Sequence, residues 1–358
     1  MISFTQSISS LQSLLTRQRT TNDIYRQMVQ AEQEVSSGRH ADSFKALGAR
    51  SIEALNTRSV YDRTVGRIEA NTLLQNRLDL MASSLGSARE AAQEVLTMAI
   101  TNTDPSSADP KFLKQMATDA YNTISSFMNS SYNGKALFSG VASDKTALNN
   151  WNDADAVTGR SPSDVMAAIT GGAITNAADA ASKLAEVDAA FNGSPADPDN
   201  AYEASFFNGT PAKTGGVTNP RMAAQIDEGL EIDFGVQAND KGIRDLMRGL
   251  SMLASVDPQK ITDPAAYKAW VGEAASALGT GVNAVLAAES RTGSMQKLVE
   301  DANSRLKAKK DILSLHITAL ESVDPYEATT RLTAADAQLQ ATYAVTAKLS
   351  QLSFLNFM

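Results

Sequence analysis

The chain has 358 residues, a formal net charge of −8, a sequence pI near 5.0, no cysteine and an aromatic fraction of only 6%. The acidic balance, without a basic stripe, argues against nucleic-acid binding, and the absence of cysteine excludes disulfides and thiolate metal ligands. Residues 1–20 lack the pattern of a cleaved secretory signal, and no run approaches the roughly 20 apolar residues that span a bilayer, so membrane insertion is not expected. These patterns alone predict a cytoplasmic protein.

The N-terminal stretch predicts a first helix over residues 1–35. Gly38, after two serines, is a suitable stop because glycine readily adopts the left-handed conformation that ends helices. Residues 40–48 then form a connector. Along the predicted helix, apolar and small residues recur mostly at three- and four-residue steps, as on one helix face: Phe4, Ile8, Leu11, Leu15, Ile24, Met28, Ala31 and Val35.

A very long helix is predicted from about residue 49 to about residue 101, where Pro105 and Pro110 follow. At ~1.5 Å per residue it is on the order of 80 Å long, which indicates an elongated rod. Its second half carries an unbroken heptad seam, which is typical of coiled-coil packing: Leu74, Leu78, Met81, Leu85, Ala88, Ala92, Val95 and Ala99.

A further helix is predicted over residues 110–129, followed by a turn at Asn133-Gly134 and a short strand at residues 136–138. The helix offers five residues for its buried side: Phe112, Met116, Tyr121, Ile124 and Met128.

The composition changes between residues 141 and 219, where Asn, Asp, Gly, Ala and Thr dominate. Short helices are expected at 165–169 and 177–190, within a small mixed α+β domain. Residues 221–226 and 230–236 alternate apolar and polar side chains around Asp227-Glu228-Gly229, which predicts a β-hairpin.

Helices return after the hairpin, one from the cap Asn239 or Asp240 to about residue 254 and another from Pro264 to about 278. Gly279-Thr280-Gly281 is interpreted as a turn that separates the latter from a long helix over 281–321. The buried side of that helix is predicted to contain Met295, Leu298, Ala302, Leu306, Leu313 and Leu320.

The last helix has a start signal in which Asp324 is the N-cap, Pro325 the first helical residue and Glu327 the third residue after the cap. Its seam, Leu332, Ala335, Leu339, Thr342, Thr346 and Leu349, is the natural partner of the N-terminal seam. The chain closes on an apolar run that needs a partner in water. The predicted assembly residues are therefore Phe4, Ile8, Leu11, Leu15, Leu332, Leu339, Leu349, Leu352, Phe354, Leu355 and Phe357.

The expected fold is mainly α, an elongated rod of long coiled-coil-like helices formed by both termini, with a small α+β outer domain inserted in the middle. Three parts are nested. Residues 1–42 and 323–358 form the terminal helices, 43–140 and 221–322 form a helical rod domain with a β-hairpin, and 141–220 form a variable outer domain.

No catalytic or metal-binding motif stands out, so we expect neither an enzyme nor a bound cofactor or metal. His40 and His316 fall in a connector and a long helix without a motif around them. Asp197, Asp199 and Glu203 lack the spacing and the glycine of an EF-hand. The glycines at 279 and 281 lack the third glycine and the preceding strand of a dinucleotide site.

Several segments resemble the flagellin family. The closing segment carries the resemblance most specifically, with VDPYEATTRL at 323–332, LQATY at 339–343 and LSQLS at 349–353. This segment is more similar to the hook–filament junction proteins of the family than to filament flagellins. Shorter similarities lie elsewhere: SSGR at 36–39, LFSG at 137–140, IDEG at 226–229, FGV at 234–236, RDLM at 244–247 and SRTG at 290–293.

The resemblance implies a structural adaptor that joins the hook side of the bacterial flagellum to its filament through its terminal helices. It implies a ring of copies, contact with another hook-associated junction protein and with flagellin, and an export chaperone for the C-terminal helix. It also implies an extracellular location after type III export without a cleaved signal. Two alternatives remain open: a filament flagellin, and a cytoplasmic coiled-coil scaffold protein.

Overall fold

A computed structural model describes residues 3–105, 110–257 and 260–355. The chain divides into two compact units, one made of residues 1–66 and 307–358 and the other of residues 67–306. We refer to them as the terminal unit and the central unit. The three-part division of the sequence analysis stays a prediction. The mainly α fold, with long terminal helices and a small strand-containing middle region, is confirmed.

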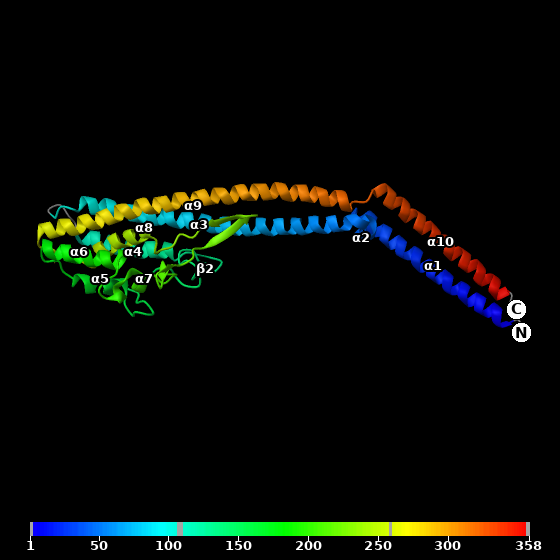
Figure 1. Cartoon of the computed structure of the whole chain (residues 1–358), viewed down its shortest axis with the longest axis horizontal. Helices are drawn as coiled ribbons and strands as arrows, with labels where there is room; N and C mark the ends of the chain where they lie inside the picture. The colour runs from blue at the N-terminus through cyan, green and yellow to red at the C-terminus, as the bar shows by residue number, and fades with distance from the viewer. Residues whose placement is uncertain (1–2, 106–109, 258–259, 356–358) are drawn as a thin grey trace. The chain divides into compact units, whose positions relative to one another are not determined.

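The terminal unit is built from helices contributed by both ends of the chain. Helices α1 and α10 lie side by side in antiparallel order (Figure 1). The first turns of α3 are joined to the last turns of α9 by the pairs Arg58–Glu321 and Glu53–His316. The predicted connector is partly helical, because Asp42 accepts a hydrogen bond from the Lys45 amide and so caps a short helix. The elements are α1 Ser3–Ser37, α2 Ser43–Leu47, the 3₁₀ helix η1 Gly48–Arg50, α3 Ser51–Thr101, α9 Pro264–Glu321 and α10 Pro325–Leu355.

The central unit contains the larger parts of α3 and α9, the remaining helices and three two-stranded antiparallel sheets. The helices predicted at 110–129, 165–169 and 177–190 are present, with α5 and α6 capped by Ser161 and Asn176. The elements are α4 Pro110–Met128, β1 Ser131–Tyr132, β2 Lys135–Ala136, α5 Pro162–Thr170, α6 Ala177–Asn192, η2 Pro198–Asn200, α7 Tyr202–Ser205, β3 Lys213–Thr214, β4 Val217–Thr218, β5 Ala223–Asp227, β6 Leu230–Asp233 and α8 Lys241–Ser255.

The predicted hairpins follow their turn chemistry. Asn133 and Gly134 both have positive φ, and Tyr132 pairs with Lys135 across them. Of the strand expected at 136–138, only Ala136 lies within a strand, β2. Strands β5 and β6 pair around Gly229, which also has positive φ.

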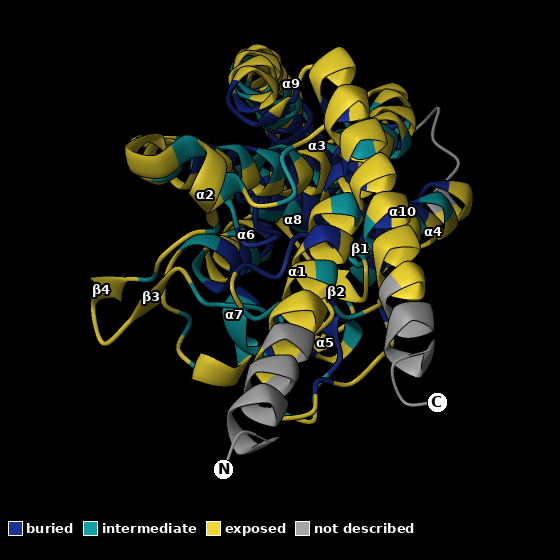
Figure 2. Ribbon diagram, turned by 90° about the vertical axis from the view of Figure 1, so that its right-hand side faces the viewer, coloured by how far each residue is buried: buried dark blue, intermediate teal, exposed yellow. Residues whose placement is uncertain are grey.

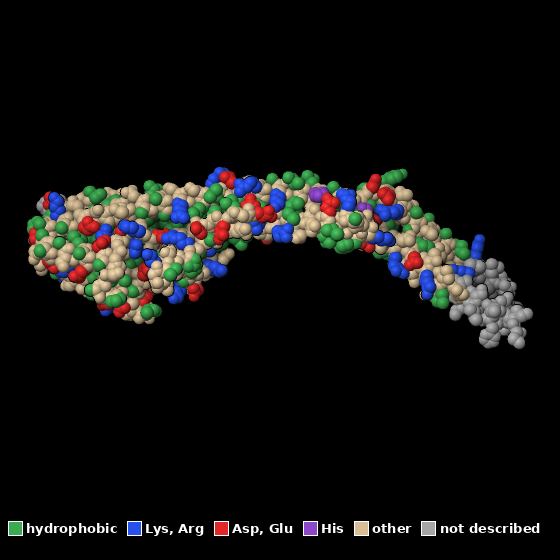
Figure 3. Space-filling view, in the orientation of Figure 1, with side chains coloured by type: hydrophobic (Ala, Val, Ile, Leu, Met, Phe, Trp, Pro, Cys, Tyr) green, Lys and Arg blue, Asp and Glu red, His purple; other side chains and the backbone are tan. Residues whose placement is uncertain are grey.

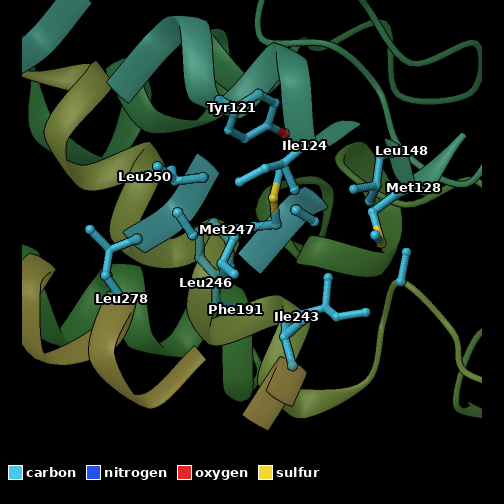
Figure 4. Packing of buried hydrophobic residues seen from close by; sticks show 14 of the residues in the cluster. Tyr121, Ile124, Met128, Leu148, Phe191, Ile243, Leu246, Met247, Leu250 and Leu278 are labelled. Atoms are coloured by element: carbon cyan, nitrogen blue, oxygen red, sulfur yellow. The ribbon is translucent and has the colours of Figure 1, made fainter. Parts of the chain in front are cut away.

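One hydrophobic core runs through the central unit and includes the compositionally distinct middle region. The Trp151 and Tyr121 rings meet edge to face with centroids 5.2 Å apart, so the middle region packs directly on α4. The Tyr202 hydroxyl donates to the carbonyl of Ala238 at 2.9 Å. Figure 4 shows part of this packing between α4 and α8. The heptad seam of α3 from Leu74 to Ala99 is buried throughout, as predicted.

Two residues of the central unit that were predicted to be buried are exposed. Phe112 is 53% exposed, and its neighbour Leu113 is fully buried instead. Leu298 is 46% exposed, whereas Val299 is buried. Both errors are shifts of one residue, which rotate a side chain by about 100° around a helix axis. The seam of α9 follows Val299, Ala302 and Leu306.

The predicted break at Gly279-Thr280-Gly281 is also wrong, because α9 continues without interruption from Pro264 to Glu321. The reason is packing. A Cβ atom on Gly281 would lie 2.6 Å from the backbone nitrogen and Cα of Leu246 on α8. The glycine therefore permits close approach of two helices, and it does not end one.

Candidate assembly surface

The two terminal helices pack through alternating large and small side chains. On α1, Ile24 and Ala31 are each 4% exposed, and on α10, Ala328 is fully buried and Ala335 and Leu339 are buried (Figure 2). The alanines let the helix backbones approach while the larger side chains fill the seam. This seam uses the inner side of each helix only.

The structure describes the side chains of three of the predicted assembly residues. Leu339 is buried in the seam, Leu332 is half-buried, and Leu15 is 49% exposed. Val35, which the same pattern placed in the seam, is 39% exposed. The side chains of the other predicted residues lie outside the described part of the structure: Phe4, Ile8, Leu11, Leu349, Leu352, Phe354, Leu355 and Phe357.

Helix α10 begins at Pro325, directly after Asp324. An Asp324 carboxylate oxygen accepts from the Tyr326 amide at 2.8 Å, which satisfies one of the free N–H groups at the helix start. Glu327 lies 3.9 Å from the Arg331 guanidinium, one turn along the same helix. The carboxylate also lies in the first turn, where the helix dipole favours negative charge.

A buried carboxylate stands where α9 ends. Glu321 is 2% exposed and accepts two hydrogen bonds from the Arg58 guanidinium on α3, at 2.5 Å each. The Arg39 guanidinium lies 3.8 Å from the same carboxylate. The hydrogen bonds that the Arg58 guanidinium donates to Glu321 raise the pKa of that guanidinium. Two arginines thus compensate the one buried charge.

Backbone pairing surrounds this ion pair. The His40 amide donates to the Glu321 carbonyl at 3.0 Å, and the Val323 amide donates to the Gly38 carbonyl at 3.1 Å. Arg39 and Ser322 lie opposite each other as an antiparallel bridge. The segment that leaves α1 is therefore paired to the segment that enters α10. We call this pairing, with Arg58 and Glu321, the clasp.

A second buried carboxylate ties α1 to α10. Glu34 is 9% exposed, lies 3.0 Å from the Arg331 guanidinium, and accepts from the Ala41 amide at 3.1 Å. The His40 ring lies 3.8 Å from the same carboxylate. No local sequence pattern marks Glu34 or Glu321, because their arginine partners are brought near only by folding.

The terminal unit exposes an unusual amount of apolar surface, and Figure 3 shows hydrophobic side chains on the surface of its described part. More than half of the large hydrophobic side chains that are exposed in the described part of the chain belong to this unit, which is about a third of the chain. Exposed apolar surface of this extent marks an interaction site. The residues are Leu15, Tyr25, Val29, Val35, Phe44, Ile52, Leu55, Ile312, Leu315, Tyr326, Tyr343 and Val345.

A groove of about 460 Å³ lies beside the clasp. We call it the corner groove. Apolar side chains form its walls, and the Arg58–Glu321 ion pair lies among its polar lining. Its residues are Gln30, Ala41, Asp42, Ser43, Phe44, Leu47, Ser51, Ala54, Leu55, Arg58 and Glu321.

The residues considered above for catalysis or metal binding form ion pairs and hydrogen bonds with nearby residues. The His316 ring lies 3.1 Å from the Glu53 carboxylate, in an exposed pair. The hydrogen bond from Arg160 lowers the pKa of the Asp197 carboxyl. Glu203 accepts from the Ala212 amide and the Asn239 side chain. Among the described residues, no group of three or more His, Asp or Glu side chains could hold a metal ion, and no described helix is long and apolar enough to span a membrane.

Family sequence models match both the N-terminal and the C-terminal part of the chain. The sequence model of the bacterial flagellin N-terminal helical region matches residues 8–143, and that of the bacterial flagellin C-terminal helical region matches residues 275–358. No curated protein sequence matches the chain. One solved structure similar to it is the "putative flagellar hook-associated protein from Vibrio parahaemolyticus", at 14% identity and a TM-score of 0.49, covering 77% of this chain and 99% of the other. Since the two family regions together span more than half of its residues, the chain belongs to the flagellin family of bacterial flagellar structural proteins.

Proposed function

We propose that this chain is the hook–filament junction protein hook-associated protein 3, a structural adaptor that assembles through its terminal helices. The observation that carries the proposal is the concentration of exposed apolar side chains on the terminal unit. The resemblance of residues 323–353 to the closing segment of that junction protein favours it over a filament flagellin.

The physical reason for assembly is the free energy gained when exposed apolar side chains are buried between copies. Burial of one large apolar side chain contributes roughly 1.5–3 kcal/mol relative to leaving it in water. The seam between α1 and α10 uses only their inner faces, and Leu15, Tyr25 and Val29 on α1 stay exposed. Neighbouring copies would cover these outer faces. A ring or tube of copies is therefore the expected form.

The partners of the proposal are those that the resemblance to the junction protein implies. Copies of the chain form a ring, with another hook-associated junction protein on the hook side and flagellin on the filament side. An export chaperone covers the C-terminal helix before assembly. The chain leaves the cell by the flagellar export pathway without a cleaved signal and acts outside it.

Electron microscopy of cells that lack this chain tests the adaptor role. The proposal predicts hooks without filaments, together with unassembled flagellin in the culture medium. If the chain were the filament flagellin, the hooks would also be bare, but no flagellin would be found in the medium. Normal filaments would contradict both roles.

Fractionation separates these roles from a cytoplasmic scaffold. The proposal predicts that the chain is recovered with appendages sheared from the cells and that little stays in the cytosol. A chain that remained wholly in the cytosol of flagellated cells would contradict the proposal.

A further inference from the structure

We propose that the corner groove of one copy receives Tyr326 of the next copy, so that the contact joins two different surfaces of the chain. This inference rests on the proposed self-assembly and assigns a specific contact within it. Tyr326 and the corner groove both lie beside the clasp.

Tyr326 is the projecting side chain. It is 84% exposed, more than any other exposed aromatic residue in the described part of the chain. It stands on the first turn of α10, which Asp324 and Pro325 fix in place. A tyrosine has an apolar ring and a polar tip, and it loses little conformational entropy when it is buried at an interface.

The outer face of α10 continues from Tyr326. At 100° per residue, Tyr326, Thr330 and Thr333 lie on the side of the helix opposite Ala328 and Ala335, which are buried where α10 packs on α1. A shallow surface hollow of about 430 Å³ runs along this face, with Ala334 and Ala337 in its lining. No charged residue lines it. A neighbouring surface could therefore approach this face closely.

The corner groove matches the chemistry of the tyrosine side chain. Phe44, Leu47 and Leu55 offer apolar walls, and Phe44 is 63% exposed and Leu55 51% exposed. Gln30 and Arg58 supply polar groups that could reach the phenol hydroxyl. The groove can hold one aromatic ring and satisfy its polar tip.

Charged groups stand around both surfaces: acidic ones beside Tyr326, and Arg58 and Lys45 together with Asp42 and Glu321 at the groove. Asp324 and Glu327 flank Tyr326, and the Glu327 side chain is 68% exposed. The groove side carries Arg58, whose side chain is 49% exposed, and the exposed Lys45. The Asp42 carboxylate in the groove accepts from the Lys45 amide and caps α2. Acidic and basic partners at the rim of a contact favour its register and its rate of formation.

The two surfaces point to a second copy because they lie on opposite flanks at the same end of the terminal unit. Figure 2 shows α2, which lines the groove, on one side of α1 and α10 on the other. Tyr326 therefore cannot fill the groove of its own chain. Side-by-side copies at the same level bring the two flanks together, and a contact between two different surfaces generates a ring or a helical array.

Cross-linking through introduced cysteines tests this contact, because the native chain has none. Thr330 lies one turn from Tyr326, and Ser43 lines the groove. A Ser43→Cys/Thr330→Cys variant in sheared appendages, treated with a short bis-maleimide, should give a ladder of two, three and more linked chains. Each single variant should stay unlinked, since neither surface contacts the same surface of a neighbouring copy.

Three outcomes would overturn the contact. A ladder with glutaraldehyde but none with the bis-maleimide would show that copies assemble in another way. Dimers of the Thr330→Cys single variant would show that α10 of one copy contacts α10 of another. A link from Ser43→Cys to Phe354→Cys would place the C-terminal segment in the groove. Absence of the native chain from the appendages would instead overturn the proposed function itself.

A pair of substitutions at Tyr326 gives a second measurement on the purified chain. Tyr326→Ala should weaken self-association about thirtyfold, the effect of losing one aromatic anchor, whereas Tyr326→Phe should remain within a few-fold of the native chain because the ring is kept. Sedimentation across a concentration series measures the self-association of both variants. Equal association by Tyr326→Ala and the native chain would contradict the proposal.

Discussion

Arg58 and Glu321 are 263 residues apart in sequence, and the Arg58 guanidinium donates two hydrogen bonds to the Glu321 carboxylate where α1, α3, α9 and α10 meet. The carboxylate is almost wholly buried and the arginine is half exposed. A buried ion pair is weak evidence for stability, because desolvation offsets much of the attraction. Its directional bonds can instead select one arrangement of the clasp.

The first prediction uses the unequal burial of this pair. Arg58→Ala should destabilise the clasp by about 3 kcal/mol, because Glu321 would remain buried with only the more distant Arg39 beside it. Glu321→Gln should cost about 1 kcal/mol, since Arg58 can reach water. Hydrogen exchange at the His40 and Val323 amides should then rise about a hundredfold for the first variant and several-fold for the second.

The exposed pair Arg50–Glu53, at 3.5 Å, provides the control. Arg50→Ala should change exchange at the clasp little, because exposed ion pairs contribute roughly 0–1 kcal/mol. Equal effects of Arg50→Ala and Arg58→Ala would show that the clasp does not depend on its buried carboxylate.

The second prediction concerns the two glycines of α9. Gly281→Ala should destabilise the central unit by about 1–3 kcal/mol, because its Cβ would clash with the Leu246 backbone. Gly279→Ala should be neutral or stabilising by up to about 1 kcal/mol, since the nearest atom to its Cβ is 4.0 Å away and alanine favours the helix. Urea unfolding followed by tryptophan fluorescence measures both, and a destabilised Gly279→Ala would contradict this explanation.

The third prediction concerns the start of α10. Asp324→Ala should destabilise the first turn by about 1 kcal/mol, because the Tyr326 amide loses its acceptor. Asp324→Asn should keep most of the cap, since an amide oxygen can accept the same bond. Hydrogen exchange at the Tyr326 amide distinguishes the variants. Equal protection in both would mean that Pro325 alone sets the helix start.

The fourth prediction is a pH dependence in the central unit. Burial of Asp155 tends to raise the pKa of its carboxyl, but hydrogen bonds, chiefly from the amides of Thr158 and Val157, outweigh that effect and leave the pKa below its usual 3.8. The stabilisation is therefore present above about pH 4 and is lost as the pH falls through the lowered pKa.

Exchange of the Thr158 amide, corrected for the intrinsic rate at each pH, should show this loss below pH 4. Asp155→Asn should remove the pH dependence, because an amide side chain does not titrate in this range. A native profile that matched the Asp155→Asn profile would show that the carboxylate is not the group responsible.

Sequence reasoning worked where the signal was local or periodic. The heptad seam from Leu74 to Ala99, the Asn133-Gly134 turn and the start of α10 at Pro325 all follow from spacing or from cap and turn residues. The prediction that Leu298 is buried was wrong, because an error of one residue in the helical phase moves a side chain out of the seam. The prediction of a helix break at Gly281 was wrong, because this glycine serves the close approach of Leu246 on a different helix, and the sequence does not reveal that approach.

The assembly surface was only partly accessible from the sequence. The apolar end of the chain and the pairing of the terminal seams could be anticipated from residue type and period. The corner groove could not, because Phe44, Leu55 and Arg58 come together through the fold of the connector and α3. The clasp was missed for the same reason, since a partner 263 residues away leaves no local pattern.

Immunogold labelling of isolated hook–filament complexes tests the central claim most directly. An antibody against the exposed residues of the central unit should label one position, between the hook and the filament, in preparations of the native strain. Label along the whole filament would show that the chain is the filament flagellin, and absence of label from every appendage would show that it has no place in the extracellular flagellum.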